Sequence, residues 1–158
     1  MPISEYVARL RRCVGHDPLI LVAAGACIRD EQGRILLLKR AGEDDLWSVP
    51  GGGMDPGENL SETVVREVRE ETGLIVEPVE LIGIYSSPEY AFAYPNQDQV
   101  FPVIAFLECR VTGGSLEVDM DEIVEARYCG PDELPRLMTC CLAKALDAFA
   151  YEGKAFFR

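Results

Sequence analysis

The sequence is short of positive charge: 15 lysines and arginines stand against 27 aspartates and glutamates, so the net charge is −12. Nucleic acids and anionic membranes bind through a basic patch, and this balance argues against both kinds of partner. A nucleotide ligand is compatible with this charge, because metal ions and a few local cations can hold a small phosphate ligand. The sequence also lacks a long apolar run that would span a membrane, and its start lacks a signal-peptide pattern.

Histidine is nearly absent, and the six cysteines form no CxxC pair. The spacing that binds zinc is therefore missing. The single histidine, His16, lies in an N-terminal connector, which argues against a cysteine nucleophile with a histidine base. Cys27 and Cys109 fall within apolar runs, where a reduced thiol behaves as a small hydrophobic group. We therefore expect reduced cysteines and a cytoplasmic protein.

The length of 158 residues suits one domain with a sizeable core, and we find no internal repeat. We expect this domain to span residues 1–158, with an N-terminal helix and connector over 1–18 and a C-terminal helix and tail over 138–158. Apolar residues recur at helical spacing in the N-terminal segment, which predicts that its helix is amphipathic. A mitochondrial presequence is the competing interpretation, which Glu5 disfavours.

Apolar runs between turn residues predict several strands and two further helices. The strands are expected over residues 19–28, 34–40, 46–50, 79–87, 99–111, 115–118 and 125–129, and the helices over 59–72 and 138–151. The first two strands flank the turn at 30–33 and should pair as a hairpin. Because hairpins outnumber crossovers, we expect an α+β fold or a mixed sheet with helices on both sides.

The helix over 59–72 follows a glycine-rich turn and carries clear end signals. Asn59 is a good N-cap, Glu62 stands three residues later as in a capping box, and Gly73 suits the left-handed residue after a helix. These signals fix the face on which each side chain of the helix lies.

Three glutamates, Glu67, Glu70 and Glu71, share one face of this helix, beside its apolar stripe. Like charges at this spacing weaken a helix by roughly 0.2–0.5 kcal/mol per pair. Partial burial favours protonation unless a cation keeps the carboxylates charged. We interpret them as ligands of a divalent cation such as Mg²⁺, which often shares its coordination with substrate phosphates. A solvated acidic face and a simple ion-binding site without EF-hand spacing are the competing interpretations.

The whole segment fits the pattern G-x5-E-x7-R-E-U-x-E-E-x-G-U, where U is a bulky aliphatic residue. The matching positions are Gly52, Glu58, Arg66, Glu67, Val68, Glu70, Glu71, Gly73 and Leu74. This is the signature of the Nudix hydrolase family, which the chain therefore resembles. The resemblance implies an α/β/α sandwich around a mixed β-sheet. It also implies metal-dependent hydrolysis of a nucleoside diphosphate linked to another moiety.

The resemblance also implies roles for single residues. Glu70 and Glu71 match the family's main metal ligands, here for Mg²⁺ or Mn²⁺. Glu67 matches a residue that is a ligand or the general base in different members, and Glu58 matches an additional ligand. Arg66 matches the arginine that orients the glutamates.

Further site residues are expected around this set. Gly51 or Gly52 can offer a backbone carbonyl to the metal, since the missing side chain permits a close approach. Some family members take the general base from a later loop, for which Glu122 is preferred here, with Asp119 and Asp121 beside it. A solvated acidic turn is the alternative for this loop.

Substrate contacts are expected from the irregular loop over 87–98 and from the end of the second strand. Tyr94 can stack on a base or hold the loop in place. Asn96 can contact a ribose, or it can anchor the turn. Arg40 can contact a phosphate, or it can simply lie at the solvated end of the strand. The expected partner is a small-molecule nucleotide, and the family's frequent dimers make a homodimer a candidate assembly.

The substrate itself is left open by the sequence. A nucleoside triphosphate, ADP-ribose or another nucleotide sugar, and a dinucleoside polyphosphate all contain the required bond. A nucleotide-sensing domain that has lost turnover is the alternative of another class. The complete set of glutamates argues against it, because a domain that only binds has no need for all of them.

Overall fold

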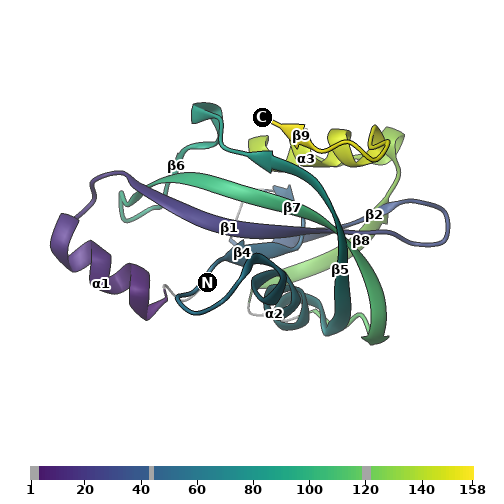
Figure 1. The fold of residues 1–158 in the computed structure, drawn as a ribbon, viewed down its shortest axis with the longest axis horizontal. Helices are drawn as coiled ribbons and strands as arrows, with labels where there is room; N and C mark the ends of the chain where they lie inside the picture. The colour runs from purple at the N-terminus through teal and green to yellow at the C-terminus, as the bar shows by residue number, and fades with distance from the viewer. Residues whose placement is uncertain (1–3, 43–44, 119–121) are drawn as a thin grey trace.

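Two β-sheets lie between helices on opposite sides (Figure 1). The computed structural model describes residues 4–42, 45–118 and 122–158. The larger sheet has the strand order β4-β1-β7-β5-β9, with β6 paired to β7, and the smaller sheet has the order β3-β2-β8. The larger sheet is mixed, because β1 pairs with β7 and β5 with β9 in parallel. The predicted α/β/α arrangement around a mixed sheet is confirmed.

The elements have the following bounds. The helices are α1 (Glu5–Val14), α2 (Leu60–Thr72) and α3 (Thr139–Phe149), and short 3₁₀ turns cover Pro88–Tyr90 and Pro131–Glu133. The strands are β1 (Leu19–Ile28), β2 (Ile35–Arg40), β3 (Trp47–Ser48), β4 (Gly51–Gly53), β5 (Leu74–Tyr85), β6 (Phe92–Ala93), β7 (Gln99–Gly114), β8 (Ile123–Cys129) and β9 (Phe156–Phe157).

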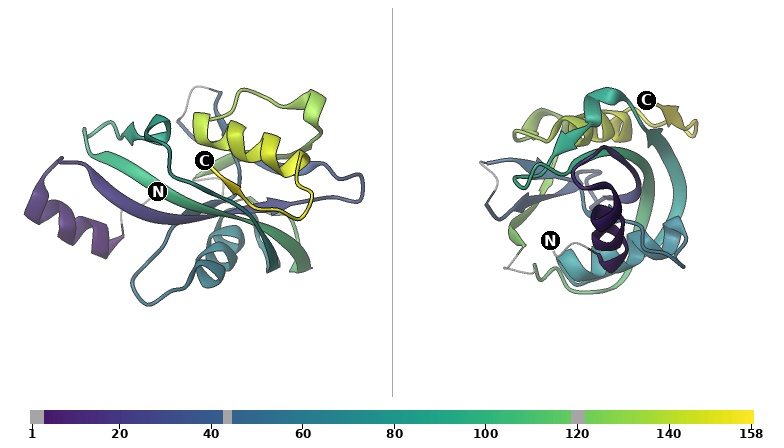
Figure 2. Two further views of the ribbon diagram at one scale, coloured as in Figure 1. Left: turned by 45° about the horizontal axis from the view of Figure 1, so that its top comes forward. Right: turned by 90° about the vertical axis from the view of Figure 1, so that its left-hand side faces the viewer.

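Two hydrophobic cores fill the spaces between these layers, one on the side of α2 and one on the side of α3 (Figure 2). Strand β2 contributes to both, because successive side chains of a strand point to opposite faces. Ile35 and Leu37 pack in the core beside α3, whereas Leu36 and Leu38 pack in the core beside α2. All four are at most 1% exposed, so β2 is buried on both faces.

The predicted hairpin of β1 and β2 is correct only at its turn. Gly33 donates to the carbonyl of Asp30, and Arg29 pairs with Ile35 in an isolated bridge. Beyond that bridge the strands separate, since β1 pairs with β4 and β7 while β2 pairs with β3 and β8. The turn residues determine the reversal of the chain, and beyond the turn β2 joins the smaller sheet, where it is buried on both faces.

Two other strand predictions are wrong, one in its start and one in its existence. Strand β5 begins at Leu74, directly after α2, and not at Val79. It accommodates Pro78 at a shift of register against β7, where a strand tolerates the missing N–H donor. The short strand expected at 115–118 is absent, because β7 itself continues to Gly114.

The cysteines are consistent with the sequence prediction. All six are free thiols, and Cys27 and Cys109 are buried. Burial raises the pKa of the Cys109 thiol to about 12, so it stays protonated at neutral pH. None of the helices in the described ranges has both the length and the apolar character to cross a membrane.

Candidate active site

Helix α2 starts and ends as its sequence predicts. The Asn59 side chain accepts from the backbone N–H of Glu62 at 3.0 Å, and the Glu62 carboxylate accepts from the backbone N–H of Asn59 at 2.8 Å. Gly73 closes the helix in the left-handed conformation, with φ of 71°. The predicted capping box is therefore confirmed. With both ends fixed, Val64 and Val68 are buried, and the acidic residues lie along the edge of the core.

The three glutamates on α2 differ sharply in exposure. Glu67 is 7% and Glu71 3% exposed. The side chain of Glu70, by contrast, is 61% exposed. Because charged carboxylates lose hydration on burial, the pKa of Glu67 is raised, and that of Glu71 is raised to about 7. The helix thus presents two buried carboxylates and one that reaches solvent.

Arg66 connects four acidic or carbonyl groups. Its guanidinium donates to both carboxylate oxygens of Glu58, at 2.6 and 2.9 Å, and to Glu67 Oε1 at 2.7 Å. It also donates to the carbonyl of Gly53 at 3.0 Å and lies 3.5 Å from Glu70 Oε2. The side chain is therefore placed to orient the glutamates, the role that the sequence motif assigns to it.

Glu58 joins the loop before α2 to this arginine. Its carboxylate also accepts from the backbone N–H of Asp55 at 3.1 Å and from the hydroxyl of Thr63 at 3.0 Å. The hydrogen bonds from Arg66 are the main reason that the pKa of Glu58 falls to about 2. Glu58 is thus ionised at any physiological pH.

Glu71 is held from the opposite side by Arg40 and Gly51. Arg40 Nη2 donates to Glu71 Oε1 at 2.5 Å and to the carbonyl of Gly51 at 3.3 Å. The backbone N–H of Gly51 donates to Glu71 Oε2 at 2.8 Å. The sequence left Arg40 either at a phosphate or at a solvated strand end, and these contacts place its guanidinium against a glutamate and the glycine strand.

Two glycines of β4 permit this close arrangement. Gly51 has φ of 139°, and a Cβ there would collide with the backbone of Ala24 on β1. A Cβ on Gly52 would collide with the carboxylate of Glu67. The glycines are needed for packing as well as for the turn, because β4 is pressed between β1 and the acidic helix.

A cleft of about 960 Å³ opens beside the glutamates. Glu67, Glu70 and Glu71 line it together with Glu122, and Tyr94 and Asn96 are also among its lining residues. The structure thus brings Glu122, Tyr94 and Asn96 to one cleft with the acidic helix. The other expected site residues, Arg40, Glu58 and Gly51, are not among its lining residues. Asp119 and Asp121, the other candidate bases, lie outside the described residues.

The long loop before β7 combines anchoring and exposure. The Asn96 amide donates to Asp98 Oδ2 at 3.0 Å, and its oxygen accepts from the backbone N–H of Asp98 at 3.1 Å, so Asn96 anchors the turn while it lines the cleft. Tyr90 is buried in the core against Tyr85, with ring centroids 6.3 Å apart. Tyr94 is 46% exposed, lies edge-on to Phe92 with ring centroids 5.0 Å apart, and lines the cleft.

One wall of the cleft was not predicted from the sequence. Helix α1 contributes Tyr6, Val7 and Arg11, and the start of β1 contributes Ile20 and Val22. The amphipathic pattern of α1 indicated a helix, but nothing in that pattern specified where the helix would pack.

The donor set of the cleft fits a hard divalent cation, which prefers carboxylate oxygens. Two of these carboxylates are withdrawn from water, so a cation would offset the cost of their charge. Within the described ranges, no three acidic, histidine or cysteine side chains converge as a ready-made ion cage. Instead, Glu67 turns to Arg66 and Glu71 to Arg40. A bound cation would therefore compete with arginine for these oxygens.

The fold and this acidic cleft are those of a Nudix domain. The family model of the NUDIX domain matches residues 19–149. The chain therefore belongs to the Nudix hydrolase family, as its glutamate signature predicted.

Sequence relatives and solved structures agree with this assignment. An ADP-ribose pyrophosphatase of Methanocaldococcus jannaschii is 36% identical over 112 residues, or 70% of this chain and 62% of that protein. A MutT-like protein of Streptomyces ambofaciens is 32% identical over 137 residues, or 86% of this chain and 81% of that protein. The crystal structure of an ADP-ribose pyrophosphatase from Streptococcus suis has a TM-score of 0.68 at 28% identity, covering 87% of this chain and 97% of that one. The chain thus spans less than two thirds of the archaeal relative.

Replacing Arg66 tests its connecting role. Arg66→Ala should lower the free energy of unfolding by about 2 kcal/mol, because it leaves several charged hydrogen bonds unmade. Urea titration at pH 7 measures the loss. Arg69→Ala, an exposed arginine on the same helix, is the control and should change stability by less than about 0.5 kcal/mol. Equal losses in the two variants would show that Arg66 does not organise the site.

The buried Glu71 predicts a pH dependence in the absence of divalent ions. Its carboxyl titrates near pH 4.5 when unfolded and at about 7 when folded, so the folded state keeps the proton longer. Its contribution to stability is therefore full below pH 4.5 and is lost as the pH rises to 7, by about 3 kcal/mol. Urea titrations in EDTA should show this decline in the wild type and a smaller one in Glu71→Gln. Identical pH profiles for the wild type and Glu71→Gln would show that Glu71 does not titrate with a raised pKa.

Proposed function

We propose that this chain hydrolyses the pyrophosphate bond of a nucleoside diphosphate linked to another moiety, and that it uses Mg²⁺ or Mn²⁺. One observation carries the proposal: Arg66 bonds to Glu58 behind the cleft and holds Glu67 and Glu70, which line the cleft together with Glu71. A purely structural ion-pair network has no need for a cleft of about 960 Å³ beside it.

Each acidic residue has a role in the proposal. Glu70 and Glu71 are the main ligands of the cation, Glu58 is an additional ligand, and Glu67 is either a further ligand or the general base. A divalent cation bound there would neutralise charge on the diphosphate and make an attacking water molecule more acidic. Arg66 keeps the carboxylates oriented, and burial of Glu67 and Glu71 excludes bulk water from their side of the cleft.

The general base is either Glu67 or Glu122. Burial raises the pKa of Glu67, which increases its affinity for a proton, and its contact with Arg66 fixes its position. Glu122 lines the same cleft from the loop before β8. Each carboxylate would take the proton of the attacking water, so the two assignments differ in the residue and not in the chemistry.

The relatives guide the choice of substrate. Two of the proteins compared above are named ADP-ribose pyrophosphatases, so ADP-ribose stands first among the substrates that we propose to test. The net charge of −12 favours small nucleotides over nucleic acids, because long anions are repelled by an acidic surface.

A panel of ADP-ribose, nucleotide sugars, nucleoside triphosphates and dinucleoside polyphosphates tests the proposal. With Mg²⁺, at least one compound should release phosphate, pyrophosphate or a nucleoside monophosphate, and EDTA should abolish the release. Glu70→Gln should lower kcat by roughly 100-fold or more, with little change in stability, because the side chain is largely exposed. Glu31→Gln, an exposed turn residue, is the matched control and should keep full activity.

Two outcomes would overturn the proposal. If no compound is cleaved while calorimetry still detects nucleotide binding, the chain is a nucleotide-sensing domain. If Glu70→Gln turns over as fast as the wild type, the cleavage does not use the acidic helix.

A further inference from the structure

Helix α1 lies outside the segment that matches the NUDIX domain, which begins at residue 19, yet it forms a wall of the cleft. It stands at the end of the molecule away from α3, beside the start of β1 (Figures 1 and 2). None of its residues is fully buried, so no core of its own holds it in place. A helix with so little packing needs specific contacts to stay docked.

Arg11 provides those contacts. Its guanidinium donates to three backbone carbonyls, those of Gly15 at 3.2 Å, Asp17 at 2.6 Å and Gln99 at 2.7 Å. The first two belong to the connector that leads into β1, and the third begins β7. One side chain thus ties the helix to the ends of two neighbouring strands.

The same arginine also contacts the loop that precedes β7. Arg11 Nε lies 3.5 Å from Asp98 Oδ2 in an ion pair, and both side chains are at least nine-tenths buried. Asp98 also contacts His16 Nδ1 at 2.7 Å and accepts from the amide of Asn96 at 3.0 Å. Helix, connector and loop are therefore joined through one carboxylate.

The surface between these anchors is apolar and aromatic. Ile20 is 76% and Val22 39% exposed, and both line the cleft with Val7 of α1. Tyr6 and Tyr94 add two rings to the lining. Exposed aliphatic and aromatic side chains in a cleft offer their surface to a flat apolar group.

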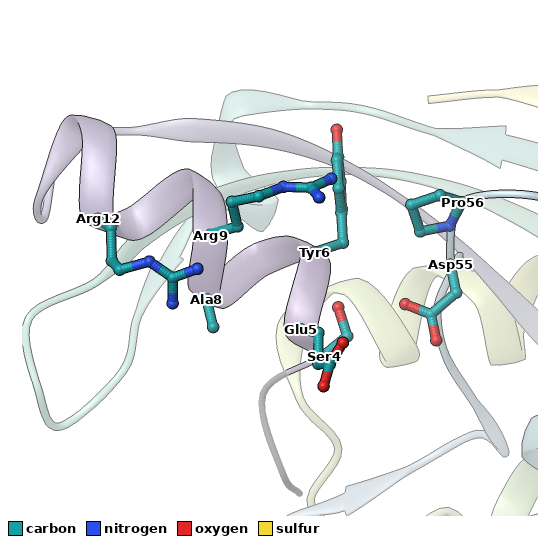
Figure 3. A pocket seen from close by; sticks show the side chains of 8 residues that line it. All are labelled: Ser4, Glu5, Tyr6, Ala8, Arg9, Arg12, Asp55 and Pro56. Atoms are coloured by element: carbon teal, nitrogen blue, oxygen red, sulfur yellow. The ribbon is translucent and has the colours of Figure 1, made fainter.

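A second hollow, of about 700 Å³, lies between α1 and the loop at Asp55 (Figure 3). Arg9 and Arg12 line it, with the Arg9 guanidinium beside the Tyr6 ring, but Glu5 and Asp55 line it as well, so its charge is mixed. Tyr6 stands at the boundary of the hollow and the cleft, because it lines both. The mixed charge disfavours an anion here and leaves the apolar wall of the cleft as the recognition surface.

We propose that α1 and the start of β1 form the subsite for the nucleobase of the substrate, with Arg11 as the positioning residue of that wall. The inference rests on the proposed hydrolysis, whose diphosphate lies at the glutamates. Of the groups joined to that diphosphate, sugars and phosphates are polar on every side, whereas a base presents two flat apolar faces. The base is therefore the part that suits Val7, Ile20 and Val22.

Calorimetry with AMP and with ribose 5-phosphate tests the subsite, since the two ligands differ only in the base. The wild type should bind AMP at least tenfold more tightly. Arg11→Ala should weaken AMP binding about tenfold and that of ribose 5-phosphate less than twofold. Ile20→Thr should weaken AMP binding about threefold, because it removes apolar contact area and keeps the β-branched shape.

Two matched controls accompany these variants. Arg12→Ala removes an exposed arginine from the same helix, and Ile75→Thr changes an isoleucine that is 47% exposed on β5. Both should bind AMP like the wild type. Hydrogen exchange should show faster exchange over 5–14 in Arg11→Ala and unchanged exchange in α2, which proves that the variant is folded.

Kinetics separate this positioning role from a general loss of structure. For a substrate that the nucleotide panel identifies, Arg11→Ala should raise KM about tenfold and change kcat less than twofold. A fall in kcat with KM unchanged would overturn the inference. Equal affinity for AMP and ribose 5-phosphate, undetectable binding of both, or equal effects of Arg11→Ala and Arg12→Ala would overturn it as well.

The inference and the proposed function fail in different ways. If no pyrophosphate bond is cleaved but AMP binding depends on Arg11 and Ile20, the subsite stands and hydrolysis does not. If a substrate is cleaved and these variants bind and turn over like their controls, hydrolysis stands and the subsite does not.

Discussion

The site depends on the desolvation cost of two charged groups, because the carboxylates of Glu67 and Glu71 are buried at the edge of a hydrophobic core. Glu67 and Glu71 lose hydration there, and arginines only partly compensate for the loss, so both carboxyls are harder to ionise than in water. This desolvation cost destabilises a protein unless a ligand offsets it. Arg66 and Arg40 reduce the cost, because each pairs with one of the carboxylates and holds it in a fixed orientation. A cation that binds these carboxylates must therefore compete with the two ion pairs.

Backbone packing supports this arrangement as directly as the charges do. Strand β4 approaches β1 and α2 so closely that neither Gly51 nor Gly52 has space for a Cβ. The carbonyl and N–H of Gly51 also meet Arg40 and Glu71. The position of the acidic helix is therefore linked to the larger sheet through β4. A shift of the backbone at Ala24 would move Gly51 and, with it, the carboxylate of Glu71.

The fold class and the geometry of helix α2 could be predicted from the sequence, but the pairing of the strands could not. The capping box, the glycine after α2 and the glutamate spacing are local features, and local features determine which face each carboxylate of α2 occupies. The separation of β1 from β2, the early start of β5 at Leu74 and the position of Arg40 against Glu71 depend on residues far apart in the chain. Amphipathic periodicity predicted α1 but could not place it, because its docking uses main-chain carbonyls that no sequence pattern marks.

Those carbonyls have a consequence for which positions around α1 can change. Arg11 donates to backbone atoms at three positions, so the side chains of Asp17 and Gln99 can vary without loss of the hydrogen bonds, whereas the positive φ of Gly15 restricts that position to glycine. The anchoring requires only an arginine on the helix and a carboxylate at Asp98. Substitutions at Asp17 or Gln99 therefore leave the anchoring of α1 intact, whereas loss of the single side chain at Arg11 removes three hydrogen bonds at once. The docking of the whole helix is thus concentrated in one residue.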